Sequence, residues 1–280
     1  MWRACSARPR NFCATLNHDR ASPGFLSAFA SFSVWGKRRD QMRERILCYA
    51  LRYHGEWNKI AKAIGRDEEW SPCACAYDFV TLGEPGYPEA FAALRFPPWI
   101  VFYRGDLSLL ARSCVAVVGS RRASGEGIRA CARTVEILSR RHVIVSGLAK
   151  GIDACAHRCA LERGTIGVIG CGIDVVYPKE NAALYARMAR DHLIVSEYPP
   201  QTPPLAAHFP WRNRLIAARE DALVVIEASA AQRHDAYGQR SAGAVPSGLL
   251  PVPFFSREDY TGNALLIQLS RERCRRAGRR

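Results

Sequence analysis

Five short turns between residues 115 and 228 carry the glycines, hydroxyls and cations that bind phosphate groups. They are Gly119-Ser120-Arg121, Ser146-Gly147-Leu148-Ala149-Lys150-Gly151-Ile152-Asp153, Tyr177-Pro178-Lys179-Glu180-Asn181, Ser196-Glu197-Tyr198-Pro199 and Phe209-Pro210-Trp211-Arg212-Asn213-Arg214. Each lies where an apolar run of strand length ends. Because the carboxyl ends of parallel strands share one edge of a sheet, and such folds bind ligands there, the pattern predicts a polyanionic ligand.

The first three turns suit phosphate for different reasons. Gly119 lets the backbone approach an anion, Ser120 can donate a hydrogen bond, and Arg121 offers a bidentate charged contact. Residues 146–151 open a helix, whose amino terminus favours anions. Lys179 precedes another helix and can reach a phosphate there, although a solvated loop lysine is the alternative interpretation.

The turn at Phe209–Arg214 interleaves aromatic and cationic side chains. Aromatic faces stack on bases while arginines hold the backbone, which is the combination expected for single-stranded nucleic acid. In the alternative interpretation Phe209 and Trp211 pack in the core, and Arg214 pairs with a carboxylate such as Glu197.

Catalysis and cofactor binding are not favoured by the sequence. Asp153 and His157 lie four residues apart on one helix face, so they could form an acid–base pair, but a capping and packing pair is the preferred interpretation because no nucleophile or metal set accompanies them. The dinucleotide fingerprint is incomplete, since Gly119–Ser124 lacks its second glycine and no acid ends the next strand at Ser146. We therefore predict no catalytic residue, no cofactor and no metal.

Eleven cysteines are present, but none forms a CxxC pair. Cys73 and Cys75 have no second half of a metal pattern, and Cys155 and Cys159 flank His157 on a predicted helix. We interpret the cysteines as small buried thiols in a reducing cytosol. No apolar run approaches the length of a membrane span, so we expect a cytoplasmic protein without membrane contact.

Aliphatic strands alternate with helical stretches along the middle of the chain. The predicted strands are 99–103, 115–118, 143–145, 166–169, 193–195 and 223–226, and the predicted helices after the first strand are 125–140, 152–163, 181–190 and 211–218. This alternation predicts an α/β fold with a doubly wound, mostly parallel sheet, an extended Rossmann-like fold.

Four regions follow from the composition. Residues 1–41 lack a helical period and form a doubtful extension, and Met42 is an alternative start. Residues 42–75 predict a small helical segment with a turn near Gly55. Residues 76–232 hold the Rossmann-like domain, and residues 233–280 form an atypical tail. The net charge is +14, but residues 42–232 carry 24 basic and 20 acidic side chains. Local placement of cations is therefore more informative than the total charge.

Taken together, the turns resemble the DprA/Smf family of DNA-processing proteins. The resemblance covers roughly Thr81 to Ala228 and adds Tyr87-Pro88, Pro97-Pro98 and Tyr103-Arg104-Gly105-Asp106 to the five turns, in one order. It implies an extended Rossmann fold that binds single-stranded DNA without sequence preference, forms a homodimer and loads the RecA recombinase onto incoming strands during natural transformation.

The resemblance also implies roles for individual residues. The expected DNA-binding residues are Gly119, Ser120, Arg121, Ser146, Gly147, Lys150, Tyr177, Lys179, Asn181, Phe209, Arg212, Asn213 and Arg214. The expected loop-shaping residues are Gly151, Asp153, His157, Gly172 and Glu197.

The tail departs from the family pattern. After Ala228 the family continues with a Ser-Gly-Ser/Thr turn and a helix, whereas here residues 232–244 have no apolar period; residues 260–268 resemble the family again. We hypothesise frameshifts in this region, which also bears the dimer contacts of the family. Two alternative functions remain: a nucleotide-binding hydrolase of the lysine-decarboxylase-like group, whose Pro-Gly-Gly-x-Gly-Thr loop is absent, and a non-functional relic of a DprA gene.

Overall fold

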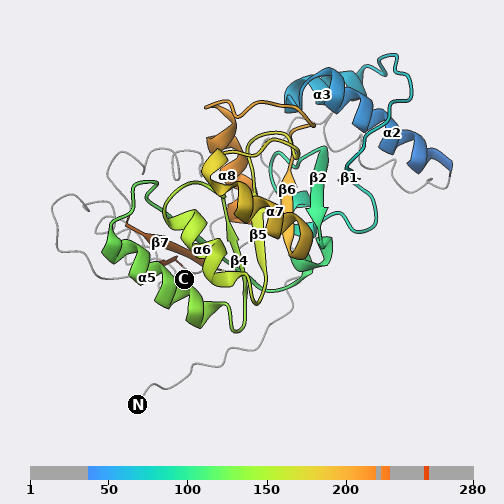
Figure 1. Ribbon diagram of the computed structural model, residues 1–280. Coiled ribbons are helices and arrows are strands. Elements are labelled where there is room, and N and C mark those ends of the chain that lie inside the picture. Colours follow the sequence, from blue (N-terminus) through green and yellow to red (C-terminus); the bar gives the residue numbers. More distant parts are fainter. Residues whose placement is uncertain (1–36, 219–221, 228–248, 252–280) are drawn as a thin grey trace, which may run out of the picture. The chain divides into compact units, whose positions relative to one another are not determined.

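The computed structural model describes residues 37–218, 222–227 and 249–251. Within them, eight strands form one sheet in the order β1-β2-β6-β5-β4-β3-β7-β8 (Figure 1). Their bounds are β1 Asp78–Thr81, β2 Ile100–Gly105, β3 Cys114–Gly119, β4 Val143–Ser146, β5 Thr165–Val168, β6 Leu193–Ser196, β7 Ala222–Ile226 and β8 Leu249–Pro251. The six neighbouring strands β6, β5, β4, β3, β7 and β8 are parallel to one another. Strand β2 pairs antiparallel with β6 on one side and with β1 on the other.

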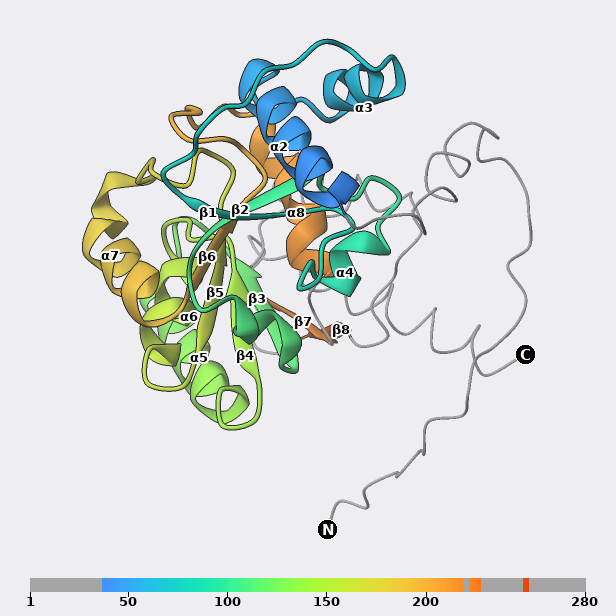
Figure 2. The same cartoon turned by 90° about the vertical axis from the view of Figure 1, so that its right-hand side faces the viewer.

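Helices cover both faces of this sheet. Their bounds are α2 Lys37–Arg52, α3 Trp57–Gly65, α4 Glu89–Ala92, α5 Gly125–Leu138, α6 Ile152–Ala160, α7 Ala182–Asp191 and α8 His208–Ala218, with short 3-10 turns η2 at Leu107–Ala111 and η3 at Lys179–Asn181. Helices α5, α6 and α7 lie on one face, and α8 lies on the other with α4 (Figure 2). The predicted doubly wound, mostly parallel α/β fold is thus confirmed.

The burial of the central strands explains why they appear in the sequence as continuous aliphatic runs. Every residue of β4, β5 and β6 is buried, because helices cover the sheet on both sides. Strand β3 lies between β4 and β7, and successive strands proceed outward from it in opposite directions. Such a reversal opens a crevice at the carboxyl ends of the strands, where ligands bind in this class of fold.

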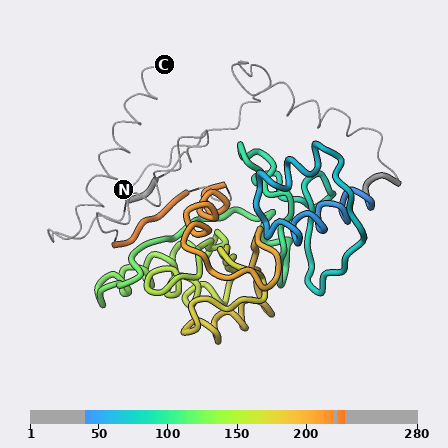
Figure 3. Tube along the Cα trace, turned by 90° about the horizontal axis from the view of Figure 1, so that it is seen from above, coloured from blue at the N-terminus to red at the C-terminus, as the bar shows by residue number. Residues whose placement is uncertain are grey.

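The amino-terminal helices belong to the same described core as the sheet edge. Ile46 and Tyr49 of α2 are in one buried cluster with Phe102 of β2 and Met188 of α7. Helix α2 lies beside β1 and β2, and β7 lies at the far side of the sheet (Figure 3). The predicted helical segment with a turn near Gly55 is therefore present as two helices.

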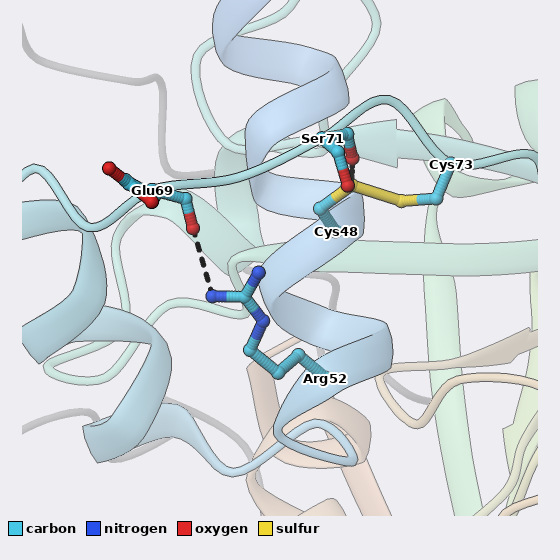
Figure 4. The surroundings of a disulfide bond; sticks show 5 residues. All are labelled: Cys48, Arg52, Glu69, Ser71 and Cys73. Carbon is cyan, nitrogen blue, oxygen red and sulfur yellow. Dashed lines mark hydrogen bonds between the residues drawn. A yellow bond between two sulfur atoms is a disulfide. The ribbon is translucent and has the colours of Figure 1, made fainter.

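A disulfide joins α2 to the segment that follows α3. The sulfurs of Cys48 and Cys73 are 2.17 Å apart and their Cα atoms 5.9 Å (Figure 4). Arg52 also donates a 3.0 Å hydrogen bond to the Glu69 carbonyl, so the segment runs back along α2. The prediction that all cysteines are free thiols is wrong for this pair, because this return brings the two side chains together.

The predictions for residues 1–36, and for the tail at 228–248 and 252–280, lie outside the described residues; these include the frameshifts and the dimer contacts. The three residues of β8 do fall within the predicted atypical tail and pair in parallel with β7. Across the described residues, none of the helices has the length and apolar character needed to span a membrane.

Candidate anion-binding site

A small pocket of about 80 Å³ lies beyond the carboxyl ends of β4 and β5. It is lined by Arg121, Gly147, Ala149, Lys150, Ile169, Gly170, Cys171, Tyr177, Pro178, Phe209 and Arg212. Eight of these eleven residues come from four of the five turns singled out in the sequence, and the structure thus brings six of the predicted DNA-binding residues together. Ala149, Ile169, Gly170, Cys171 and Pro178 were not among the predicted DNA-binding residues, and they contribute backbone and apolar surface.

Cations surround the pocket mouth. Arg121, Lys150 and Lys179 are exposed, although Lys179 stands next to the lining rather than in it. Lys150 forms a 2.5 Å ion pair with Glu180, in which both side chains are more than half exposed. Among the described residues, no carboxylate forms an ion pair with Arg121 or Lys179. Two of the three cations are therefore available to an incoming anion.

An aromatic wall stands beside these cations. The rings of Tyr177 and Phe209 lie 5.6 Å apart at a tilt of 34°, and Tyr177 is 46 % exposed. The Arg121 guanidinium lies 5.7 Å from the centre of the Phe209 ring. A flat apolar surface next to an uncompensated guanidinium can stack on a base while the cation holds its phosphate.

The floor of the pocket is a buried ionic cluster. Arg212 is 4 % exposed and donates hydrogen bonds to the carbonyls of Gly147, at 3.0 Å, and Val168. Asp153 is 7 % exposed and accepts hydrogen bonds from the Gly147 and Ala149 amides at 3.2 and 3.4 Å. Burial raises the pKa of Asp153 against the opposing charge of Arg212, and burial lowers the pKa of Arg212 to about 10.

This cluster requires glycine at position 147. A Cβ there would lie 2.6 Å from one Arg212 guanidinium nitrogen and 2.8 Å from Asp153 Oδ2, which real side chains do not tolerate. Gly151 adopts a φ of 74°, and the next amide, of Ile152, donates to the Ser120 carbonyl at 3.1 Å. The loops after β3 and β4 are thereby fixed against one another.

Several residues that were predicted to contact DNA are instead buried, and their side chains form hydrogen bonds with the backbone of neighbouring loops and strands. The Asn181 amide donates to the Leu148 and Ala149 carbonyls at 3.0 and 3.3 Å, and Ser146 donates to the Val117 carbonyl at 2.6 Å. Ser120 is buried and accepts from the Arg122 amide. Gly119 ends β3 beside β7, and the Gly172 amide donates to the Thr202 carbonyl.

Arg214 points away from the pocket. Its guanidinium pairs with Glu197, donates to the Phe96 carbonyl at 3.2 Å and lies 4.2 Å from the centre of the Trp211 ring. Glu197 is buried, and this burial raises its pKa. The structure therefore corresponds to the alternative interpretation of this segment, in which Arg214 pairs with Glu197, and half-buried Asn213 is not part of the lining either.

His157 lies in the core behind the pocket. Its Nδ1 is 2.6 Å from the Thr165 hydroxyl, which in turn donates to the Ile144 carbonyl at 2.8 Å. Burial, and then the charges of nearby cations, lower the pKa of His157 to about 3. No hydrogen bond joins it to Asp153 in the described structure, so the two residues do not form an acid–base pair here.

Sequence reasoning missed Glu227, which follows β7. Its carboxylate, 2 % exposed, accepts from the Ser124 amide at 2.9 and 3.0 Å and from the Ser124 hydroxyl at 3.1 Å, and that hydroxyl accepts from the Gly127 amide. The chain's own carboxylate thus occupies the amino terminus of α5, beside the strand reversal, where related sheets bind nucleotide phosphates. The only signal in the sequence was an acid directly after a buried strand.

Comparisons with known proteins identify similar sequences. A family model described as DNA recombination-mediator protein A matches residues 78–232. The chain is 47 % identical over 144 residues to the DNA processing protein DprA of Streptococcus pneumoniae, a match that covers 51 % of each protein, and 40 % identical over 147 residues to protein Smf of Escherichia coli, covering 51 % of this chain and 39 % of that protein. The chain spans about half the length, or less, of the curated relatives it matches.

Two solved structures are also similar. The X-ray structure of DNA processing protein A from Streptococcus pneumoniae superposes with a TM-score of 0.61 at 29 % identity, covering 82 % of this chain and 90 % of that one. The DNA processing protein A of Helicobacter pylori, a structure described for its single-stranded DNA binding mode, gives a TM-score of 0.58 at 29 % identity, covering 70 % and 90 %.

Proposed function

The chain belongs to the DprA/Smf family of DNA recombination-mediator proteins, and from this membership we propose that it binds single-stranded DNA during the DNA processing of natural transformation. The observation that carries the proposal is the convergence of four separate turns on one pocket with a cationic rim and an aromatic wall. The phosphate of a nucleotide carries its negative charge and the base its flat aromatic surface, and the rim and the wall suit them respectively.

The residues around the pocket have different roles in binding the strand. Its volume of about 80 Å³ suits one phosphate group rather than a whole nucleotide, so the strand runs across its mouth. Arg121 and Lys179 contact the backbone, and Tyr177 and Phe209 stack on bases. Arg212 holds the floor in shape and attracts the phosphate through its charge without being exposed to the strand.

Lys150 contributes less than its position suggests. It is already paired with Glu180, so a phosphate must displace a carboxylate to reach it. The net gain in charge attraction is therefore smaller than for the unpaired cations at the rim.

The finer parts of the proposal rest mainly on family membership. We propose a non-catalytic mediator that acts in the cytoplasm as a homodimer and loads the RecA recombinase onto the bound strand. In support of a non-catalytic role, Glu227 fills the helix terminus where a nucleotide-processing enzyme would hold phosphate. Among the described residues, no group of three metal-ligating side chains occurs.

The test is the affinity of the full chain for a fluorescent oligothymidine, measured by anisotropy over a range of salt concentrations. We expect Arg121→Ala and Lys179→Ala each to weaken binding equally for different sequences and to reduce the salt slope by about 0.7 per lost phosphate contact. Arg140→Ala is the control, since this exposed arginine lies just beyond the end of α5, pairs with Glu136 of that helix and does not line the pocket. Unchanged affinity in both rim variants would exclude this surface.

Two further measurements sharpen the assignment. Glu180→Gln should strengthen binding and steepen the salt dependence, because it releases Lys150 from its ion pair. Release of free base from a nucleoside monophosphate by the purified chain would instead favour the hydrolase alternative. A chain that folds but binds no strand would favour the non-functional relic.

A further inference from the structure

Three cysteines gather between α5 and α6, outside the pocket. Cys131 belongs to α5, and Cys155 and Cys159 lie one turn apart on α6. Their exposure increases outward, since Cys131 is 0 % exposed, Cys155 is 7 % exposed and Cys159 is exposed. None of the three takes part in the disulfide of α2.

Cys131 and Cys155 face each other across the helix interface. The Cys131 sulfur lies 3.7 Å from the Ile152 carbonyl oxygen of α6, and the Cys155 sulfur lies 3.7 Å from the Ile128 carbonyl oxygen of α5. Each thiol thus reaches the opposite helix at the residue three positions before the opposing cysteine. This reciprocal arrangement places the two sulfurs side by side within a buried interface.

The surroundings give the two thiols different protonation states. A hydrogen bond from Cys131 lowers the pKa of Cys155 to about 6, with a second hydrogen bond from Cys159 and the charge of Arg158 adding to the effect against burial. The same hydrogen bond raises the pKa of Cys131, and burial raises the pKa of Cys159 to about 11. Cys155 also lies in the first turn of α6, where the helix terminus stabilises a thiolate. A nucleophilic thiolate therefore has a protonated thiol as its neighbour.

We propose that Cys131 and Cys155 form a peroxide-sensitive dithiol that closes to a disulfide between α5 and α6. In the first step the Cys155 thiolate attacks one peroxide oxygen, so that an S–O bond forms, the O–O bond breaks and hydroxide leaves. In the second step the Cys131 sulfur attacks the Cys155 sulfenic acid, so that the S–S bond forms, the S–O bond breaks and water leaves. Two thiols lose two electrons to one peroxide, and an external dithiol reverses the change. The proposal does not depend on the DNA-binding function.

Tryptic mapping tests this pairing directly. The full chain, with Cys5, Cys13 and Cys274 changed to serine, is reduced, desalted, treated with hydrogen peroxide at pH 7, alkylated and digested. Cleavage after Arg129, Arg133, Lys150, Arg158 and Arg163 separates all three cysteines into different peptides. We expect peptide 130–133 linked to peptide 151–158, and the link should be lost again after treatment with dithiothreitol.

Variants separate this pairing from its neighbours. Cys159→Ser should keep the link, whereas Cys131→Ala should abolish it and leave Cys155 as a sulfenic acid that dimedone traps; a thermal melt of each variant establishes that it is folded. Cys155 should react with peroxide about 30-fold faster than a thiol with an ordinary pKa of about 8.5 if the rate follows the thiolate fraction at pH 7, and the rate should level off above pH 7. A link from 151–158 to 159–163, or a Cys155 that stays reduced while buried Cys171 is oxidised, would overturn the proposal.

Discussion

Lowering the pH should destabilise the protein through one buried histidine, His157. The Thr165 hydroxyl donates its only proton to the Ile144 carbonyl, so it accepts at the His157 contact and Nδ1 must carry the ring proton. The other ring nitrogen, Nε2, is buried without a hydrogen-bond partner. A second proton would place a charge in the core, and although a hydrogen bond with the Ser146 backbone favours that charge, burial outweighs it and lowers the pKa to about 3.

The magnitude follows from the difference between the folded and unfolded chains. The pKa is 6.5 when the ring is free in the unfolded chain and about 3 in the folded protein, so only the unfolded chain takes up a proton between these values. The stabilisation is complete above pH 6.5 and is lost as the pH falls. Between pH 7 and pH 5 the loss amounts to about 2 kcal/mol of the free energy of unfolding.

The assay is urea unfolding at pH 7 and pH 5 for the wild-type chain and His157→Asn, whose amide can replace Nδ1 at the Thr165 hydroxyl. The variant loses packing at both pH values, but its difference between them should be smaller by ~2 kcal/mol. His192 and His208, whose pKa values burial also lowers, contribute equally to both proteins. His54→Asn is the control, since His54 is exposed and its φ of 52° suits asparagine. An identical pH dependence for wild type and His157→Asn would refute the reasoning.

Two more predictions concern the buried charges. Arg212→Met should lower the free energy of unfolding by about 3–5 kcal/mol, because it leaves Asp153 buried without its counter-charge, and the double variant with Asp153→Asn should be more stable than Arg212→Met alone in urea unfolding. Glu227→Ala should empty the amino terminus of α5, so that formate, which matches the lost carboxylate, raises the melting temperature of the variant saturably and by more than that of the wild type; an equal response of both proteins would contradict this assignment.

The sequence allowed the central sheet to be predicted, because its strands are buried on both faces and read as continuous aliphatic runs. The observed ends of β3 to β7 lie within one residue of the predicted ones. Strand β1 was not predicted: Asp78–Thr81 is a four-residue edge strand with one exposed and one half-buried residue, so it has no such run. Its pairing with β2 depends on residues about twenty positions later in the chain.

The sequence predicted which turns form the site but not where the side chains of these turns point. Arg212 and Arg214 are two residues apart on α8, yet one is directed to the pocket floor and the other to Glu197. The helix geometry that separates them requires knowledge of where α8 docks. Glu227 was missed for the same reason, because its partner Ser124 lies 103 residues earlier in the chain.

The buried guanidinium of Arg212 also determines when the site can assume its shape during synthesis. Its carbonyl partners, Gly147 and Val168, precede it by 65 and 44 residues. A ribosome adds about 5–20 residues each second, so the loop after β4 exists for roughly 3–13 s before Arg212, which binds its carbonyl, has been synthesised. During that interval Asp153 lacks the neighbouring positive charge of Arg212. Strands β1 to β6 all precede Arg212 in the chain, so the anion-binding surface is completed only after these six strands have been synthesised.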